Sequence, residues 1–145
     1  MNSAGNTRRG TGGRLAELPA YECWGLLDSE EIARVAWQGR EEVAIVPVNY
    51  TVADGSLWFR TSPYSTLGRE CTGQRLAIEV DHIDRATQSA WSVVVSGVGE
   101  LVDAAEVPDV LADLRVWPSG NRPLFIRVEP VDVTGRKLLT SAGVD

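Results

Sequence analysis

The chain has 145 residues and a formal net charge of −6, and its 43% hydrophobic and 23% charged residues are those of an ordinary globular protein. This length fits one domain with its own core. The acidic balance argues against nucleic acid or an anionic membrane as the main partner, because both need a basic surface. No apolar run approaches the ~20 residues that span a bilayer.

The reactive side chains exclude several kinds of site. His82 is the only histidine and Lys137 the only lysine, so we expect no metal site, no Ser-His-Asp triad and no Schiff-base lysine. The two cysteines, Cys23 and Cys71, are far apart, which favours buried thiols in a reducing compartment and a cytoplasmic location. Any chemistry is therefore expected to come from a bound cofactor.

The N-terminal region predicts a tail followed by a helix. Residues 1–16 are expected to be a disordered tail, because they are rich in Gly, Ser, Thr, Asn and Arg, and residues 17–140 the folded domain. Apolar residues recur at helical spacing over 18–27 and predict a short amphipathic helix. A capping-type turn then leads into the first strand, residues 32–37.

Residues 43–72 predict two strands, a tight hairpin and a short helix. The apolar run at 43–48 is typical of a strand buried on both sides. Asp54-Gly55 is a strong hairpin signal, because Gly accepts the positive φ of the primed turns. The second strand covers residues 57–61.

The second strand ends in hydroxyl groups beside one guanidinium, just before the helix predicted at 65–71. Two interpretations stay open. The group is either a phosphate seat at a helix start, or ordinary capping chemistry with Ser65 or Thr66 as the N-cap. The residues concerned are Arg60, Thr61, Ser62, Ser65 and Thr66.

Leu76, Ile78 and Val80 alternate with Ala77, Glu79 and Asp81 and predict a strand that begins after a helix stop at Gly73. Glu79 and Asp81 lie two residues apart and so share one face of this strand. They form either a carboxylate pair for general acid–base work or partners of an arginine such as Arg60 or Arg75.

The C-terminal half predicts the rest of a small barrel. The longest β pattern, residues 90–102, contains Gly97 and Gly99, which allow it to bend. A helix is expected over 104–116 with Asp103 as N-cap, and the last strand over 124–133 with Pro130 at an edge or bulge. About six hairpin-connected antiparallel strands with short helices indicate a mainly β barrel. Three tryptophans are expected at a pocket or dimer interface: Trp58, Trp91 and Trp117.

Several segments occur together in a characteristic order: RVAW at 34–37, VPVNY at 46–50, DGSLWFRTSP at 54–63, LAIEVDHID at 76–84, WSVVVSGVGELV at 91–102 and FIRVEPVDVTGRKL at 125–138. In this order the chain, over residues 21–138, resembles the pyridoxamine 5′-phosphate oxidase-like, flavin-binding split-barrel family. The resemblance implies a homodimeric split β-barrel with FMN at the dimer interface. It also implies a small-molecule oxidoreductase.

The resemblance also assigns cofactor-binding residues. The strand at 47–50 would line the flavin ring, the segment at 60–66 would hold the phosphate, residues 91–92 would approach from the partner subunit, and Trp117 would cover part of the pocket. The implied set is Pro47, Val48, Asn49, Tyr50, Arg60, Thr61, Ser62, Ser65, Thr66, Trp91, Ser92 and Trp117. No catalytic residue is assigned, although Tyr50 and Tyr64 are candidate proton donors near the expected ring.

The chain departs from the family at the phosphate loop. Where members often read T-x-P-G-[ST]-K-L, Tyr64 stands for the Gly and Thr66 for the Lys. Arg60 or Arg69 could replace the lost cation. This departure leaves two alternatives to FMN: a deazaflavin-dependent reductase of the same fold, or a flavin-free ligand-binding or interaction module.

Overall fold

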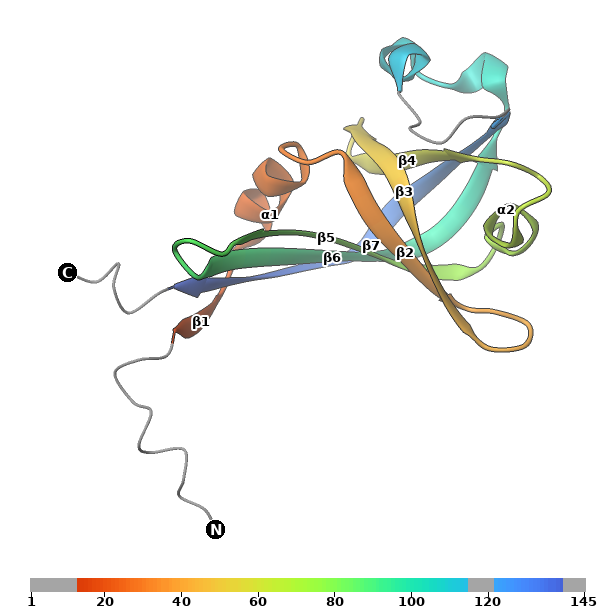
Figure 1. The fold of residues 1–145 in the computed structure, drawn as a ribbon. Helices are drawn as coiled ribbons and strands as arrows, with labels where there is room; N and C mark the ends of the chain where they lie inside the picture. The colour runs from red at the N-terminus through yellow and green to blue at the C-terminus, as the bar shows by residue number, and fades with distance from the viewer. Residues whose placement is uncertain (1–12, 115–121, 140–145) are drawn as a thin grey trace.

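The described residues form seven β-strands, two short α-helices and two 3₁₀ turns (Figure 1). The computed structural model describes residues 13–114 and 122–139. In chain order these contain β1 (Arg14–Glu17), α1 (Ala20–Leu27), β2 (Ile32–Gln38), β3 (Val43–Ala53), β4 (Ser56–Thr61), α2 (Thr66–Glu70), β5 (Arg75–Asp84), β6 (Ser89–Val102), the 3₁₀ turns η2 (Ala104–Glu106) and η3 (Asp109–Asp113), and β7 (Leu124–Leu139).

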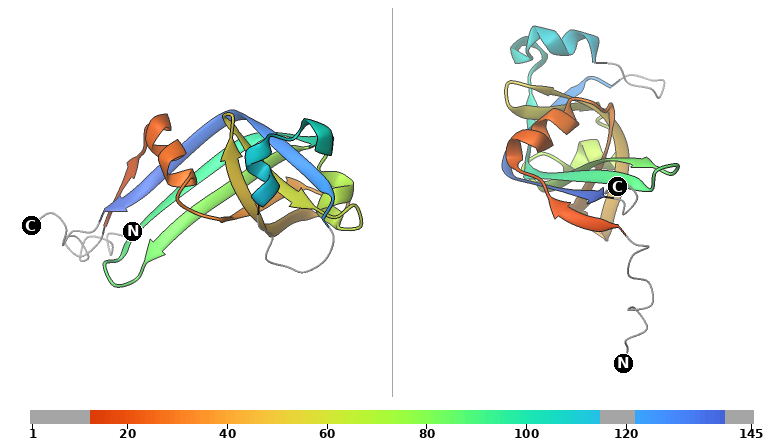
Figure 2. Two further views of the ribbon diagram at one scale, coloured as in Figure 1. Left: turned by 90° about the horizontal axis from the view of Figure 1, so that it is seen from above. Right: turned by 90° about the vertical axis from the view of Figure 1, so that its left-hand side faces the viewer.

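The strands form one closed antiparallel sheet. Its order is β1-β7-β4-β3-β2-β5-β6, and β6 pairs in turn with β7. Strands β2 to β7 therefore make a six-stranded barrel, and the short β1 is added beside the end of β7 (Figure 2). This confirms the predicted mainly β antiparallel barrel.

The hairpin between β3 and β4 forms where the sequence predicts it. Ala53 pairs with Ser56, and the two residues between them, Asp54 and Gly55, have φ values of 53° and 74°. Two successive positive φ angles define the primed turn whose twist matches paired strands. The local sequence thus sets the register of the barrel's central hairpin.

The two longest strands bend at a bulge. Gly97 pairs with Pro130 and Ser96 with Asp132, so Val131 has no partner opposite it. A Cβ on Gly97 would lie 2.4 Å from the Glu129 carbonyl oxygen, so only glycine fits this close approach. The predicted bend and the predicted bulge at proline are both confirmed. Beyond the predicted end at 133, β7 continues to Leu139 because β6 and β1 pair with it.

The barrel interior holds one apolar core, and a smaller cluster lies outside it. Cys23 and Cys71 are fully buried, as predicted, and burial raises the pKa of both thiols. Trp58 belongs to this smaller cluster and also lines a pocket of about 210 Å³ beside it, in agreement with the expected pocket position. Its ring is buried against Ala53 and Leu111, and its Nε1 donates to the Ala53 carbonyl at 3.2 Å.

Two further expectations are corrected. Arg14–Glu17 forms β1, because these residues pair with the last residues of β7. The folded part therefore begins before residue 17. The helix expected over 104–116 is instead two 3₁₀ turns within the described residues. Asp103 does cap the first, but Pro108 precedes the second and interrupts the helical pattern.

The first half of β3 is not buried on both sides. Val43 is 71% exposed and Ile45 64%, and Pro47 is exposed on the same face. None of the helices in the described ranges is long and apolar enough to cross a membrane.

A test of the bulge compares two glycines. Gly97→Ala should destabilise the protein by ~1–3 kcal/mol, because the added Cβ collides with backbone. Gly25→Ala, on the exposed side of α1 with nothing within 4 Å of its Cβ position, should stabilise it by ~0.5–1 kcal/mol. Urea denaturation measures both, and equal effects of the two variants would contradict the bulge geometry.

Candidate functional site

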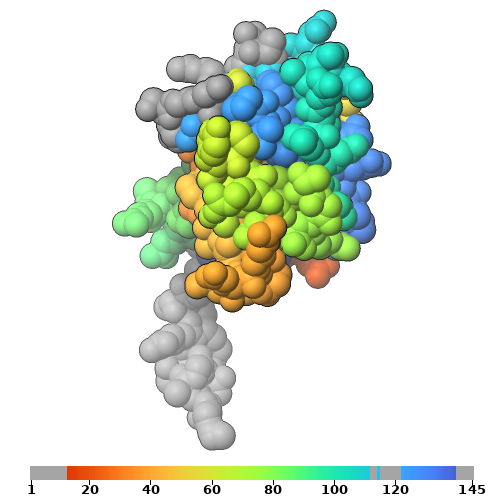
Figure 3. All heavy atoms as spheres, turned by 90° about the vertical axis from the view of Figure 1, so that its right-hand side faces the viewer, coloured from red at the N-terminus to blue at the C-terminus, as the bar shows by residue number. Residues whose placement is uncertain are grey.

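A cavity of about 390 Å³ lies where β3, the end of β4, the start of α2 and the segment before β7 meet. Its volume is within the ~300–1,000 Å³ typical of small-molecule sites. Figure 3 shows this side of the molecule, with α2 and its neighbours between the β2–β3 hairpin and the start of β7. The described lining residues are Ile32, Val46, Pro47, Val48, Asn49, Arg60, Thr61, Ser65, Thr66, Leu67 and Arg122.

The cavity brings together most of the cofactor residues implied by the sequence. Those that line it are Pro47, Val48, Asn49, Arg60, Thr61, Ser65 and Thr66. Ser62 lies just behind, where its carbonyl accepts hydrogen bonds from Ser65. Trp91 and Ser92 lie on β6 and do not line it within one subunit, and Trp117 is outside the described residues.

The hydroxyl groups at the end of β4 cap α2. Ser65 Oγ donates to the Ser62 carbonyl at 2.8 Å and accepts from the Gly68 N–H at 2.9 Å. Thr61 Oγ1 lies 2.9 Å from Ser65 Oγ, and because the Ser65 proton is already donated, Thr61 is the donor of that bond. The capping interpretation is confirmed. Both hydroxyl protons are engaged within the chain, so neither Thr61 nor Ser65 has one left to donate to an anion.

Buried and polar contacts hold α2 in place beside the cavity. Leu67 is buried in the main core, and the Glu70 carboxylate accepts a hydrogen bond of 2.8 Å from Nε1 of Trp37 on β2. Five residues of helix are too few to be stable alone. These contacts with the barrel therefore fix the wall that carries Ser65 and Thr66.

Arg60 is held by the last strand. Its Nε donates to the Arg122 carbonyl at 3.1 Å, and its guanidinium carbon lies 4.8 Å from the centre of the Phe125 ring. The pairing of Arg60 with Phe125 and of Thr61 with Leu124 creates these contacts. The charged residues among the described lining are both arginines, Arg60 and Arg122.

Of the two arginines expected to replace the missing lysine, Arg60 lines the cavity and Arg69 does not. Arg69 Nη1 donates to the Tyr64 carbonyl at 2.6 Å, and Nη2 lies 3.5 Å from Thr66 Oγ1. Arg122 was missed by sequence reasoning. No local signal could have found it, because only the pairing of β4 with β7 sets residue 122 beside the end of β4.

Neither candidate proton donor lines the cavity. Tyr50 is buried in the core, where its hydroxyl donates to the Leu27 carbonyl. Burial, with the negative charges of Glu30 and Asp28, raises the pKa of Tyr50 far above its usual range. Tyr64 is 85% exposed. The hypothesis that either tyrosine delivers a proton to a ligand in this cavity finds no contact to support it.

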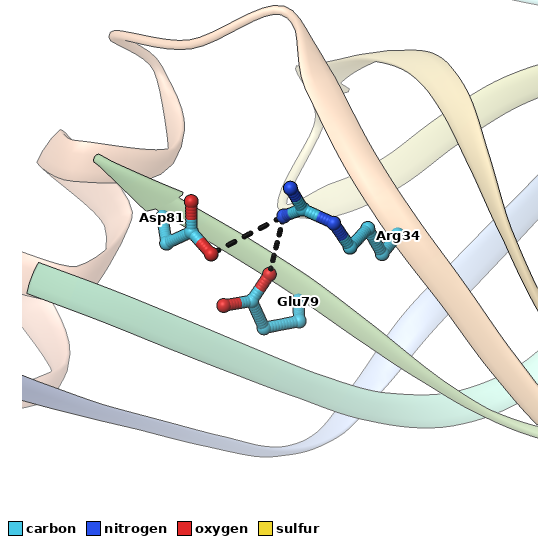
Figure 4. A network of polar contacts seen from close by, with 3 residues as sticks. All are labelled: Arg34, Glu79 and Asp81. Carbon is cyan, nitrogen blue, oxygen red and sulfur yellow. Dashed lines mark hydrogen bonds and ion pairs between the residues drawn. The ribbon is translucent and has the colours of Figure 1, made fainter. Parts of the chain in front are cut away.

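Glu79 and Asp81 share an arginine on the outer face of the barrel. Nη1 of Arg34, on β2, lies 3.2 Å from Glu79 Oε1 and 3.2 Å from Asp81 Oδ2 (Figure 4). The arginine partner is therefore Arg34, neither Arg60 nor Arg75, because β2 pairs with β5 and sets Arg34 directly opposite Glu79.

The cluster is short of positive charge, because one arginine faces two carboxylates. Burial raises the pKa of Glu79 to about 7, helped by a hydrogen bond and repulsion from Asp81 and opposed by Arg34. None of the three residues lines the cavity. The cluster can take up a proton near neutral pH, and its Arg34 lies opposite Pro47 of the cavity wall in the β2–β3 pairing.

Comparisons with known proteins agree with this geometry. The family model for pyridoxamine 5′-phosphate oxidase matches residues 19–137. An uncharacterised protein of Mycobacterium tuberculosis, Rv0080, is 31% identical over 134 residues, 88% of each chain.

Two solved structures share the fold. A FAD binding protein from Mycobacterium smegmatis is 27% identical with a TM-score of 0.68, over 86% of this chain and 98% of that one. A candidate pyridoxamine 5′-phosphate oxidase from Corynebacterium glutamicum is 27% identical with a TM-score of 0.69, over 87% and 94%.

The raised pKa of Glu79 predicts a pH-dependent stability. Between the ordinary value of 4.5 and about 7, the folded state holds a proton that the unfolded state lacks, so stability falls as pH rises through this window. Glu79→Gln should remove that fall. It should stabilise the protein at pH 8 by ~1–2 kcal/mol, a figure reduced for partial exposure, and have little effect at pH 5.

Urea denaturation at several pH values measures this effect. Glu100→Gln is the matched control, because it removes a carboxylate bound to Arg127 outside the cluster. Parallel stability profiles of wild type and Glu79→Gln would contradict the shifted pKa.

Proposed function

The chain belongs to the pyridoxamine 5′-phosphate oxidase family, and on that premise we propose that it binds a flavin in the cavity beside β3 and β4 and acts as an oxidoreductase on a small molecule. One observation carries the proposal. Residues that the family resemblance assigns to the flavin, from β3, β4 and the start of α2, line a single cavity of suitable size.

The lining divides into two parts that suit the two parts of FMN. Val46, Pro47 and Val48 offer an apolar strand surface and backbone groups for the ring. Arg60 offers a guanidinium and Thr66 a hydroxyl for the phosphate. The donor set therefore fits the cofactor.

A flavin supplies hydride and electron transfer when bound, and the chain's own residues bind, orient and shield it. Among the described lining residues none is Asp, Glu, His or Tyr. This wall therefore contributes binding and positive charge, and no proton donor. The M. smegmatis relative, named as a FAD binding protein, supports a flavin over a deazaflavin.

We also propose that a second copy of the chain covers the outer face of β2 and β3. An apolar row runs along this face through Val43, Ile45 and Pro47, with Ile32 on the neighbouring strand. Exposed apolar surface of this kind marks interaction sites. Because Pro47 and Ile32 also line the cavity, the row is continuous with the candidate site.

A dimer through this face would close the cavity. It would also explain why the resemblance assigns Trp91 and Ser92 to the partner subunit, since neither lines the cavity within one chain. A homodimer with flavin at its interface is thus the assembly that best accounts for both the exposed apolar row and the open cavity.

Flavin binding is tested by absorption and fluorescence titration of the purified protein with FMN and FAD. We expect bound flavin in the wild type and at least ~10-fold weaker FMN binding by Arg60→Ala, because a charged hydrogen-bond donor is lost. Arg69→Ala is the control, since Arg69 does not line the cavity. Wild-type protein that binds a deazaflavin but no flavin would replace the proposal, and binding of neither would end it.

The assembly is tested by sedimentation at several protein concentrations. Ile45→Glu should convert the dimer into monomers, because a carboxylate would be buried in the apolar row. Val131→Glu changes a strand residue of nearly equal exposure, 65% against 64%, away from the row and should leave the dimer intact. A dimer that tolerates Ile45→Glu would show that the subunits associate through another face.

A further inference from the structure

The cavity is positively charged on an acidic protein. The chain has a formal net charge of −6, yet the charged residues in the described lining are Arg60 and Arg122 alone. Like charges lining a concave, low-dielectric wall concentrate their field and attract counter-ions.

The end of β4 and the segment before β7 bring Arg60 and Arg122 to the same wall of the cavity. Arg60 ends β4, and Arg122 comes two residues before Leu124, which pairs with Thr61. The hydrogen bond from Arg60 Nε to the Arg122 carbonyl ties the two backbones together. Stacking over Phe125 further restricts the Arg60 guanidinium. The side chain of Arg60 and the backbone at Arg122 are therefore held in place by the fold.

The α2 segment places no cation in the described cavity lining. The position of the family's lysine is Thr66, and Arg69 is directed to the Tyr64 carbonyl and to Thr66. The hydroxyl protons of Thr61 and Ser65 are donated within the chain. Arg122, from the other end of the sequence, is the remaining charged residue of the described lining.

We propose that Arg60 and Arg122 form a two-guanidinium seat for a doubly charged phosphate group, in which Arg122 gives the site its preference for phosphorylated over unphosphorylated flavin. Guanidinium groups bind phosphate oxygens bidentately, and two of them match the charge of a phosphate near neutral pH. The flavin part of this inference rests on the proposed function, whereas the anion seat does not.

Two phosphate sources share this chemistry and behave differently with pH. The terminal phosphate of FMN has a second pKa of ~6 and loses its second charge below it. The diphosphate of FAD has no such monoester group. If FMN is the ligand, affinity should fall between pH 7 and 5 in the wild type, and this fall should be smaller in Arg122→Gln. FAD should show no such difference.

The test compares the affinities of riboflavin, FMN and FAD for the wild type, Arg122→Gln and the control Arg69→Gln. We expect Arg122→Gln to weaken binding of the phosphorylated ligand at least ~10-fold while riboflavin changes less than ~2-fold. Arg69→Gln should change none of the three. An unchanged FMN and FAD affinity in Arg122→Gln, or an equal loss for riboflavin, would overturn the proposal.

A second measurement separates this inference from the proposed function. Inorganic phosphate and pyrophosphate should raise the melting temperature of the wild type more than chloride does at equal ionic strength, and less so in Arg122→Gln. If the wild type binds no flavin but shows this stabilisation, the anion seat stands and the proposed cofactor does not. If neither flavin nor phosphate acts through Arg122, the seat is wrong.

Discussion

Closure of the sheet by β7 is the constraint on which the rest of the structure depends. This strand pairs with β4 over its first residues, with β1 over its last residues, and with β6 along nearly its whole length. An open edge would leave unpaired N–H and C=O groups for other chains to bind. Strands this long close a small barrel only if they bend, and the bulge opposite Gly97 supplies the bend.

Closure also creates the candidate site. It sets Arg122 beside Arg60, 62 residues earlier in the chain, at the place where β4 ends and α2 begins. The cavity is therefore built from strand ends and loops that the barrel holds rigidly, as is usual for binding sites. The same topology places Arg34 between Glu79 and Asp81 on the outer face. Strand pairing thus places Arg34 in a carboxylate cluster and Arg60 and Arg122 in the cavity wall.

The sequence by itself determined the features whose causes lie within a few residues. Asp54-Gly55 predicts its turn because the φ angles needed there suit few residue types. Ser65 predicts its cap because its hydroxyl reaches the N–H three residues on. Pro130 predicts a bulge because it has no N–H for the ladder. The order of such motifs was enough to indicate the family and most of the cavity lining.

Only the tertiary structure decided which strand lies beside which, and with it the environment of each side chain. Trp58 is buried because η3 covers it, whereas Ile45 is exposed although its apolar run resembles a buried strand. Glu79 meets Arg34 through strand pairing between β2 and β5. Arg122 joins the cavity for the same reason, as a neighbour of β4. Long-range pairing leaves no local signal in the sequence, because the energy that selects it comes from closing the whole sheet.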